Sequence, residues 1–322
     1  MEKLKLKTCA LCHKNAELEL SHIIPKFAIR YLKETSIGNL RSADNPNSTI
    51  QDGEKHYLLC GECEDRFSEY EKKFADNIFH PYFNQKQRAF NYDQWLHYFI
   101  TSVSWRHLYL DLLDFVQNDV VGLDALECLI ESEQLMRDYL LGKRAEIGNI
   151  EHHIFFFEDI DTISDELKEL QPHVSIHRSI CGYTAANEAT KTYFTFTNMM
   201  GIFLFTLYHK GKDEVWENTQ IVNGVGSIEA KDQRITSVCG QEITKIMENA
   251  ERSQEQLSDR QQEKIKQRLQ KAADKFEKYP IWDDFKKDRN YKKPGRGSRL
   301  CGHRAPVFYV CRKRRYAVER HF

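Results

Sequence analysis

Large apolar residues between Gly61 and Phe79 recur at spacings of three and four positions, with polar residues between them. This period is typical of a helix that buries one face. Pro81 follows closely, and proline favours the end of a helix because it lacks a backbone N–H. The pattern therefore predicts an amphipathic helix over Gly61–Phe79 that ends near Pro81.

Two further helices are predicted downstream. Residues 92–117 are dense in aromatic and aliphatic side chains at helical spacing, which indicates a buried helix. We expect His97 and His107, which lie within it, to be core residues and not ligands. Residues 122–143 form a second amphipathic pattern. Its candidate core residues are Leu123, Leu126, Leu129, Ile130 and Leu140.

The pattern changes to short β-branched and aromatic runs from residue 150. Such runs, separated by Asn, Gly, Lys and Asp, predict a small and mostly antiparallel sheet over 150–230. Helical spacing returns over 238–278, where Glu251–Lys278 is polar enough to face solvent. After Pro280 we expect an irregular basic segment, followed by a strand or hairpin within APVFYVCRKRRYAV.

These patterns predict an α+β protein with five consecutive parts. In order they are an N-terminal module that contains four of the cysteines, a helical segment, an antiparallel β-rich region, a polar helix and a basic tail, over residues 1–80, 85–148, 150–235, 236–280 and 281–322.

Composition indicates a water-soluble protein with a substantial core. The 322 residues include 19 Phe, 15 Tyr and 4 Trp, and the mean hydropathy is −0.63. The longest mostly apolar run, Met199–Leu207, is about half of the ~20 residues that a membrane-spanning helix requires. Met1–Lys7 has no apolar segment typical of a secretory signal, so we expect a cytoplasmic protein.

The formal net charge of −1 conceals a basic C-terminal tail. The segment Lys286–Phe322 contains 13 Lys or Arg and 2 Asp or Glu, and aromatic residues lie among its cations. Cations can neutralise phosphates while aromatic rings stack on bases, which favours contact with nucleic acid, mainly DNA. The alternative is a solubilising tail or one that docks on the acidic body. The candidate nucleic-acid-binding residues are Lys292, Lys293, Arg296, Arg299, Arg312, Lys313, Arg314 and Arg315.

Four of the nine cysteines form two C-x-x-C pairs, Cys9/Cys12 and Cys60/Cys63. Each pair can present two sulfurs to one ion, so together they complete the four-thiolate shell that structural Zn²⁺ prefers. The second pair follows an expected strand and opens the Gly61 helix, which is the order of a treble-clef module. We therefore predict one structural zinc ion, the alternative being four unlinked thiols.

The segment Ser21-His22-Ile23-Ile24-Pro25 lies between the two cysteine pairs. With the second C-x-x-C, it resembles the HNH endonuclease family, whose ββα-metal fold is often braced by zinc on four cysteines. The resemblance covers residues 1–80. It implies a metal-dependent nuclease that hydrolyses phosphodiester bonds of DNA, or less commonly RNA. It also implies that such a bacterial protein acts in defence against foreign DNA.

On this resemblance His22 matches the general base, a role that suits imidazole because its charge changes near neutral pH. Glu64 stands where the family has its last histidine, and a carboxylate there would bind catalytic Mg²⁺ or Mn²⁺. The family's other metal-ligand positions carry Ser21 and Ser68. The middle Asn falls near Lys55, and the nearest polar alternatives are Asp52 and His56.

Other interpretations remain open for the same residues. His22 can be a structural histidine, and Glu64 a helix N-terminal acid favoured by the helix dipole. Glu69 and Glu71 are expected to be solvated charges. The poor metal ligands Ser21 and Ser68 favour a second hypothesis, a non-catalytic, zinc-stabilised nucleic-acid-binding or assembly subunit. A third hypothesis is a subunit whose site is completed by a partner protein, such as an ATPase, because the chain has no nucleotide-binding motif.

Overall fold

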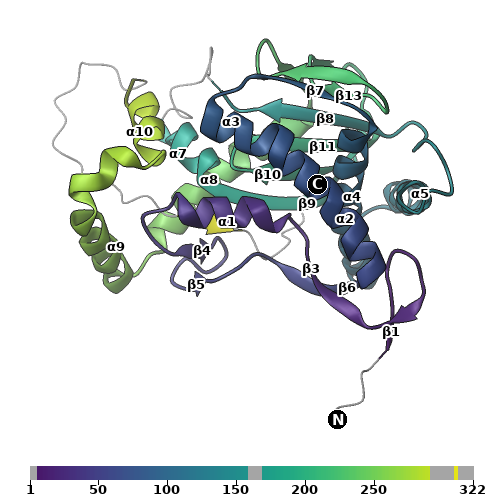
Figure 1. The fold of residues 1–322 in the computed structure, drawn as a ribbon, viewed down its shortest axis with the longest axis horizontal. Coiled ribbons are helices and arrows are strands. Elements are labelled where there is room, and N and C mark those ends of the chain that lie inside the picture. Colours follow the sequence, from purple (N-terminus) through teal and green to yellow (C-terminus); the bar gives the residue numbers. More distant parts are fainter. Residues whose placement is uncertain (1–5, 159–168, 291–307, 311–322) are drawn as a thin grey trace.

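The structure, a computed structural model, describes residues 6–158 and 169–290 and the backbone of 308–310. Its described part is α+β, as the sequence predicts (Figure 1). The helices are α1 (Lys26–Glu34), α2 (Gly61–Phe74), α3 (His80–Gln85), α4 (Gln94–Asn118), α5 (Leu123–Leu140), α7 (Pro172–His177), α8 (Gln241–Glu255), α9 (Asp259–Lys271) and α10 (Ile281–Asn290).

The strands form one large sheet and several two-stranded pairs. In spatial order the large sheet contains β13 (Gln220–Ile221), β8 (Glu151–Phe156), β11 (Ile202–His209), β10 (Thr192–Met199), β9 (Ser179–Asn187), β16 (Phe308–Val310), β4 (Leu40–Ser42) and β5 (Thr49–Ile50). The pairs are β1 (Lys7–Thr8) with β2 (Asn15–Ala16), β3 (Leu18–His22) with β6 (Lys55–Cys60), β7 (Ala89–Tyr92) with β14 (Gly226–Glu229), and β12 (Val215–Glu217) with β15 (Arg234–Thr236).

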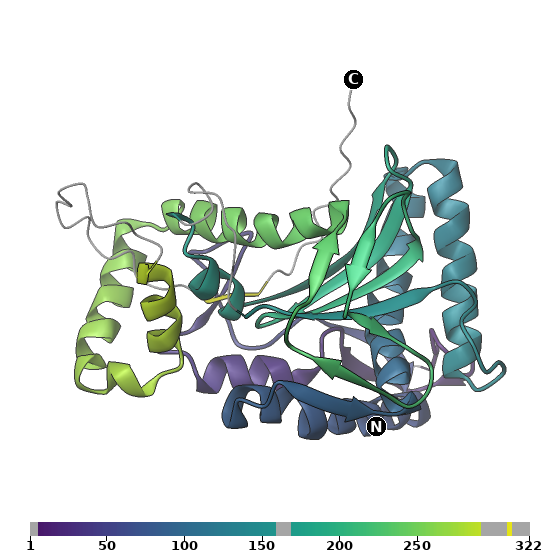
Figure 2. The same cartoon turned by 90° about the horizontal axis from the view of Figure 1, so that it is seen from above.

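The antiparallel strands β8, β11, β10 and β9 form the centre of the large sheet, between α4 and α8 (Figure 2). Phe196 pairs with Phe205, and these rings belong to the apolar cluster under α8. On the other face Thr206 contacts Ser104 of α4 at 2.7 Å. This alternation follows from the two-residue period of a strand. Because β16 runs parallel between β9 and β4, residues 40–50 join the sheet built by residues 150–221.

The predicted long helices are confirmed. The helix expected over 92–117 is α4, and His97 and His107 are buried within it, as predicted. The helix expected over 122–143 is α5. Two of its candidate core residues, Leu129 and Leu140, are buried, and Leu126 is partly buried. The other two, Leu123 and Ile130, are exposed because they lie on the face of α5 that points away from the core. No helix in the described residues has the length and apolar character needed to cross a membrane.

The helix expected over Gly61–Phe79 does not end at Pro81. It begins as α2, passes through a π-helical turn at Ala75–Phe79 and continues into α3, which ends at Gln85. Pro81 lies in the first turn of α3. The π-helical turn immediately before it, in which the His80 N–H donates to the Ala75 carbonyl, changes the backbone path at the point where the proline lacks an N–H, and the chain remains helical.

The polar region over 238–278 is helical but divided into α8, α9 and a 3₁₀ segment at Ala273–Lys278. No residue of α9 is buried, in agreement with the expected solvent-facing surface. Residues 281–290 form α10, so the first five residues of the basic segment expected to be irregular, Lys286–Asn290, are helical, and the rest of that segment lies outside the described residues. The buried residues of α10 are Ile281, Asp284 and Asp288, which recur at helical spacing and face the body of the protein.

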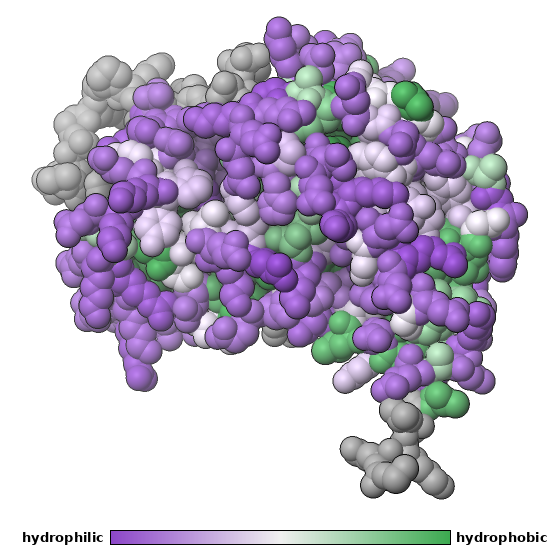
Figure 3. Space-filling view, viewed as in Figure 1, coloured by the Kyte–Doolittle hydropathy of each residue, from purple (hydrophilic) through white to green (hydrophobic). Residues whose placement is uncertain are grey.

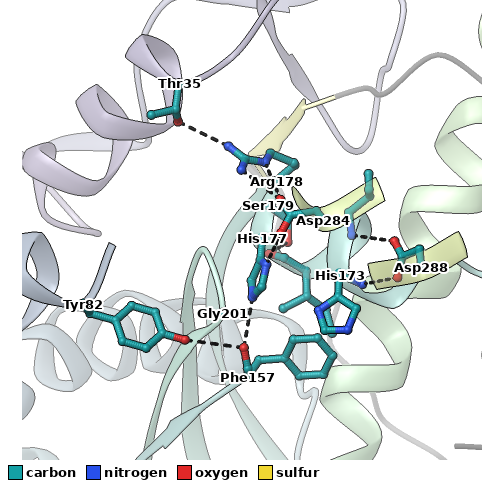
Figure 4. A network of polar contacts seen from close by, with 12 residues as sticks. Thr35, Tyr82, Phe157, His173, His177, Arg178, Ser179, Gly201, Asp284 and Asp288 are labelled. Carbon is teal, nitrogen blue, oxygen red and sulfur yellow. Dashed lines mark hydrogen bonds and ion pairs between the residues drawn. The ribbon is translucent and has the colours of Figure 1, made fainter. Parts of the chain in front are cut away.

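A buried polar network joins α10 to α7 and α1 (Figure 4). Asp284 accepts hydrogen bonds from His177 Nδ1 at 2.7 Å and from an Arg178 amino group at 2.9 Å. Arg178 also donates to Thr35 Oγ1, at the end of α1, over 3.3 Å. Burial alone would raise the pKa of Asp284, but His177 and Arg178 lower it to about 2. The network therefore fixes three helices from distant parts of the chain.

Asp288 strengthens the same junction one helical turn further along α10. Its carboxylate accepts the backbone N–H groups of His173 and Val174, each at 3.0 Å, in the first turn of α7. These donors have no partner within a helix, so Asp288 satisfies them from outside. Burial raises the pKa of Asp288 to about 6.

Candidate metal centre and the adjoining histidine

The four predicted zinc ligands come together. The Sγ atoms of Cys9, Cys12, Cys60 and Cys63 all lie within 4.8 Å of one another, and Cys12 Sγ and Cys60 Sγ are 3.7 Å apart. A tetrahedral zinc ion with Zn–S bonds of about 2.3 Å places its sulfurs about 3.8 Å apart. The cluster therefore fits a tetrahedral metal ion such as structural Zn²⁺.

Local backbone geometry presents these sulfurs. The turn after Cys9 closes where the His13 N–H donates to the Cys9 carbonyl at 2.9 Å, with His13 in the left-handed region at φ 61°. Cys60 ends β6, and its N–H donates to Cys9 Sγ at 3.3 Å. Cys63 lies in the first turn of α2. The site thus links the β1–β2 turn to the junction of β6 and α2.

The close packing of the thiols opposes their simultaneous ionisation. A hydrogen bond from Cys63 lowers the pKa of Cys9 to about 4, and the same contact raises the pKa of Cys63. Metal-bound cysteines are thiolates, so a bound cation would stabilise the charge on all four sulfurs.

His22 ends β3 and contacts an ionised carboxylate. Its Nε2 lies 3.0 Å from Asp52 Oδ1, and Asp52 Oδ2 pairs with Lys55 Nζ at 3.0 Å. Burial alone would raise the pKa of Asp52, but Lys55 and His22 lower it below its usual range. An ionised carboxylate only accepts, so His22 Nε2 donates. In the neutral ring the lone pair is then on Nδ1, where it can accept a proton.

Asp52, and not His56, is the alternative to the middle Asn that the structure brings to His22. His56 instead contacts Glu54 Oε1 at 2.8 Å, and its side chain is 45% exposed. Gly53 allows the Asp52 loop to approach α1, because a Cβ there would lie 2.0 Å from Ile29 Cδ1. The loop position is therefore set by packing.

Glu64 is connected to the end of β3 through Ser21, the residue that precedes His22. Ser21 is fully buried, and its hydroxyl donates to Glu64 Oε2 at 2.7 Å. The other ligand position on α2, Ser68, is exposed. Among the three positions at which the HNH resemblance predicts catalytic metal ligands, Glu64 alone carries a carboxylate. Mg²⁺ commonly binds through one or two carboxylates, with water and substrate phosphate as further ligands, so Glu64 would supply a single protein ligand to such an ion.

A buried arginine supports the site from α4. Arg106 donates to the His22 carbonyl at 2.7 Å and pairs with Glu71 Oε1 at 2.7 Å. Its side chain is 1% exposed and that of Glu71 18%, so the prediction that Glu71 is a solvated charge is wrong. Glu69, 62% exposed, is solvated as predicted. Burial raises the pKa of Glu71, which Arg106 opposes.

The sequence offered one signal for this support. Arg106 is a charged residue within the aromatic helix 92–117, and a buried guanidinium requires several acceptors. Glu71 lies on the same helix as Glu64, two turns further along, and Arg106 connects it to the His22 carbonyl. Within the described residues only the four cysteines form a compact group of three or more metal-ligating side chains. A cation bound by Glu64 would therefore need water or phosphate oxygens as its other ligands.

The eight candidate nucleic-acid-binding residues of the tail, Lys292 to Arg315, lie outside the described residues. Comparison of the chain with protein-family models, curated proteins and solved structures gave no match. Functional inference therefore rests on the chemistry of the site itself.

Proposed function

We propose that this protein is an HNH-like, metal-dependent nuclease that hydrolyses phosphodiester bonds of DNA. The observation that carries the proposal is the His22–Asp52 contact beside the Ser21–Glu64 contact. His22 and Ser21 pair with Lys55 and His56 of β6, at the end of the strand pair away from Cys60, and Glu64 of α2 reaches this end through Ser21. A strand pair followed by a helix is the arrangement expected of a ββα-metal unit, and the cysteines would brace it with zinc.

In this proposal His22 is the general base and Asp52 is a positioning residue. Asp52 holds the His22 ring through Nε2, and Nδ1 removes a proton from the water that attacks the phosphate. The ionised Asp52 then stabilises the positive charge that His22 acquires. Glu64 would hold Mg²⁺ or Mn²⁺, and such a cation neutralises charge on the phosphate and on the leaving oxygen.

A second candidate function is a non-catalytic nucleic-acid-binding or assembly subunit. One observation favours it: Ser21 already satisfies one oxygen of Glu64 by a hydrogen bond of 2.7 Å. In that case the zinc unit is a scaffold and His22 is a structural residue. The two candidates differ in their dependence on added divalent metal.

Nicking of supercoiled plasmid DNA tests the proposal. The purified protein, with its zinc content measured, is assayed with Mg²⁺, with Mn²⁺ and without added divalent metal. We expect nicking that requires the added metal and falls at least 100-fold in His22→Ala. Glu64→Gln should raise the metal concentration needed for half-maximal rate.

His56→Ala provides the matched control, because His56 is a carboxylate-paired histidine on the same strand pair but is more exposed. It should retain the rate of the unmodified protein. Omitting the metal is preferred to adding a strong chelator, which would also remove structural zinc. Absence of nicking by folded, zinc-loaded protein with either metal would favour the non-catalytic subunit.

A further inference from the structure

The helix that follows His22 carries a row of cations. α1 starts at Lys26, four residues after His22, and buries Ala28, Ile29 and Leu32 against the core. Lys26, Arg30 and Lys33 recur at intervals of four and three, so they lie on one face. All three are exposed. Backbone phosphates beside His22 would therefore meet positive charge along α1.

A second row of cations occupies α9, which buries none of its residues. Its members, at spacings of four, four and three, are Arg260, Lys264, Arg268 and Lys271. The surface over α9 is hydrophilic, whereas apolar side chains gather near β3 and β6, where Leu20 and Tyr57 are exposed (Figure 3). A polar, cationic helix face suits a charged partner and not an apolar one.

These seven cations have no carboxylate partner among the described residues. Lys33 Nζ donates to the Gln51 carbonyl, which leaves its charge uncompensated. By contrast, Lys14 and Lys73, which also lie on the surface, each pair with a glutamate. Unpaired exposed cations keep their full attraction for a polyanion.

The two rows are held in fixed relation. Figures 1 and 2 both place α1 between the β3–β6 pair and α9. Arg41 of β4 donates to Gln261 Oε1 on α9 at 2.9 Å. The network of Figure 4 joins Thr35, at the end of α1, to α10 through Arg178 and Asp284. The helices are about 14 and 20 Å long, lengths that span several phosphates.

We propose that Lys26, Arg30, Lys33, Arg260, Lys264, Arg268 and Lys271 form a basic track that binds the phosphate backbone of duplex DNA. The track leads from α9 along α1 to His22. This inference rests on the proposed function and deepens it, because it locates substrate binding on the described surface in addition to the tail.

Fluorescence anisotropy with a labelled 30-base-pair DNA duplex tests the track. Binding is measured without divalent metal, so that no cleavage occurs, over a range of KCl concentrations. Two variants each remove one lysine and one arginine: Lys26→Gln with Arg30→Gln, and Lys264→Gln with Arg268→Gln. Each should weaken binding at least tenfold at 0.1 M KCl. Each should also make the slope of log K against log salt shallower by about 1.8, or about 0.9 per lost contact.

The control variant combines Lys212→Gln with Arg234→Gln, two exposed cations beside β12 and β15. It removes the same charge, and its affinity should change less than twofold. The track is refuted if both track variants behave like this control, or if the unmodified protein does not bind the duplex. Tighter binding of an RNA duplex of the same sequence would refute the choice of DNA.

The binding assay also separates this inference from the proposed function. His22→Ala should still bind the duplex with the salt dependence of the unmodified protein, because all seven cations of the track are unchanged. Salt-sensitive binding through the track by a protein that never nicks DNA would support the track and contradict the nuclease. If the protein nicks DNA and the track variants nick it at the unmodified rate, the nuclease is supported and the track is contradicted.

Discussion

Two histidine–aspartate pairs occur in this protein, and their surroundings differ. His22 Nε2 lies 3.0 Å from Asp52, and His177 Nδ1 lies 2.7 Å from Asp284. In both pairs the carboxylate also contacts a cation. The first pair joins a strand end to a loop, whereas the second joins α7 to α10. The pairing itself therefore does not distinguish a chemical role from a structural one.

The second ring nitrogen distinguishes them. His177 Nε2 lies 3.0 Å from the Phe157 carbonyl oxygen, so both of its ring nitrogens face acceptors (Figure 4). His22 Nδ1 has no hydrogen-bond partner in the described part of the chain. A histidine bonded at both nitrogens is a cross-link, and one bonded at a single nitrogen can still exchange a proton. The comparison teaches that the open nitrogen, and not the aspartate, makes His22 the candidate base.

Removal of zinc should destabilise the region around His22 and Asp52 and leave the region around His177 and Asp284 folded, which is the largest difference expected between the two pairs. Structural zinc sites contribute roughly 10 kcal/mol to folding in zinc-finger peptides, because their ligands have no preformed site without metal. Hydrogen exchange should show loss of protection in β3 and β6 after zinc is stripped, while α7 and α10 remain protected. Cys63→Ser should have the same effect. Cys128→Ser, which alters a half-buried thiol of α5, should leave zinc content and protection unchanged. Retained protection of β3 and β6 without zinc would contradict this prediction.

His177→Ala should cost stability and spare activity. The substitution removes one hydrogen-bond donor from the buried Asp284 and leaves it with Arg178, and loss of a hydrogen bond to a charged group costs about 2 kcal/mol. Urea unfolding measures this loss. Plasmid nicking per folded molecule should stay within twofold of the unmodified rate. His22→Ala should show the reverse pattern, with a large loss of nicking and a change in stability of less than about 1 kcal/mol. A large loss of nicking in stable, folded His177→Ala would remove the distinction drawn here.

Acid should weaken the α7–α10 junction through Asp284. Its pKa is lowered to about 2 in the folded protein from an ordinary value of 3.8, so its contribution is complete above pH 4 and is lost as the pH falls toward 2. The contribution is about 2 kcal/mol. Urea unfolding at pH 6 and at pH 3 measures it. The stability difference between the unmodified protein and Asp284→Asn should shrink at pH 3, and a constant difference would show that the charge of Asp284 is unimportant.

Local sequence patterns predicted the features that depend on neighbouring residues. The period of apolar positions predicted α4 and α5, and the spacing of cysteines predicted the metal cluster, because a C-x-x-C turn places two sulfurs by itself. The helical path through Pro81 was not predictable from the proline alone, since the π-helical turn that precedes it has no recognisable pattern in the sequence.

The support of the site depends on contacts between distant segments. Arg106 reaches the His22 carbonyl across 84 positions, and Asp284 reaches Arg178 across 106. Neither pairing has a period or motif, so charged residues such as Glu71 were expected to be solvated. The basic composition after Pro280 likewise concealed two aspartates, Asp284 and Asp288, whose helical spacing aims them at α7. Tertiary packing decides such positions.

Asp52→Asn should have the smallest effect and tests what the aspartate contributes to the first pair. Asparagine can still accept from His22 Nε2 through its side-chain oxygen, but it cannot stabilise a positive ring or pair with Lys55. We expect a nicking rate about tenfold lower, and a rate about 100-fold lower in Asp52→Ala, the range found when residues that orient reactive groups are removed. Thermal unfolding should change little in both, because Asp52 is partly exposed. If Asn and Ala lower the rate equally, Asp52 does not orient His22. If the rate falls only as far as the folded fraction falls, the Asp52 contact is structural, as it is at His177.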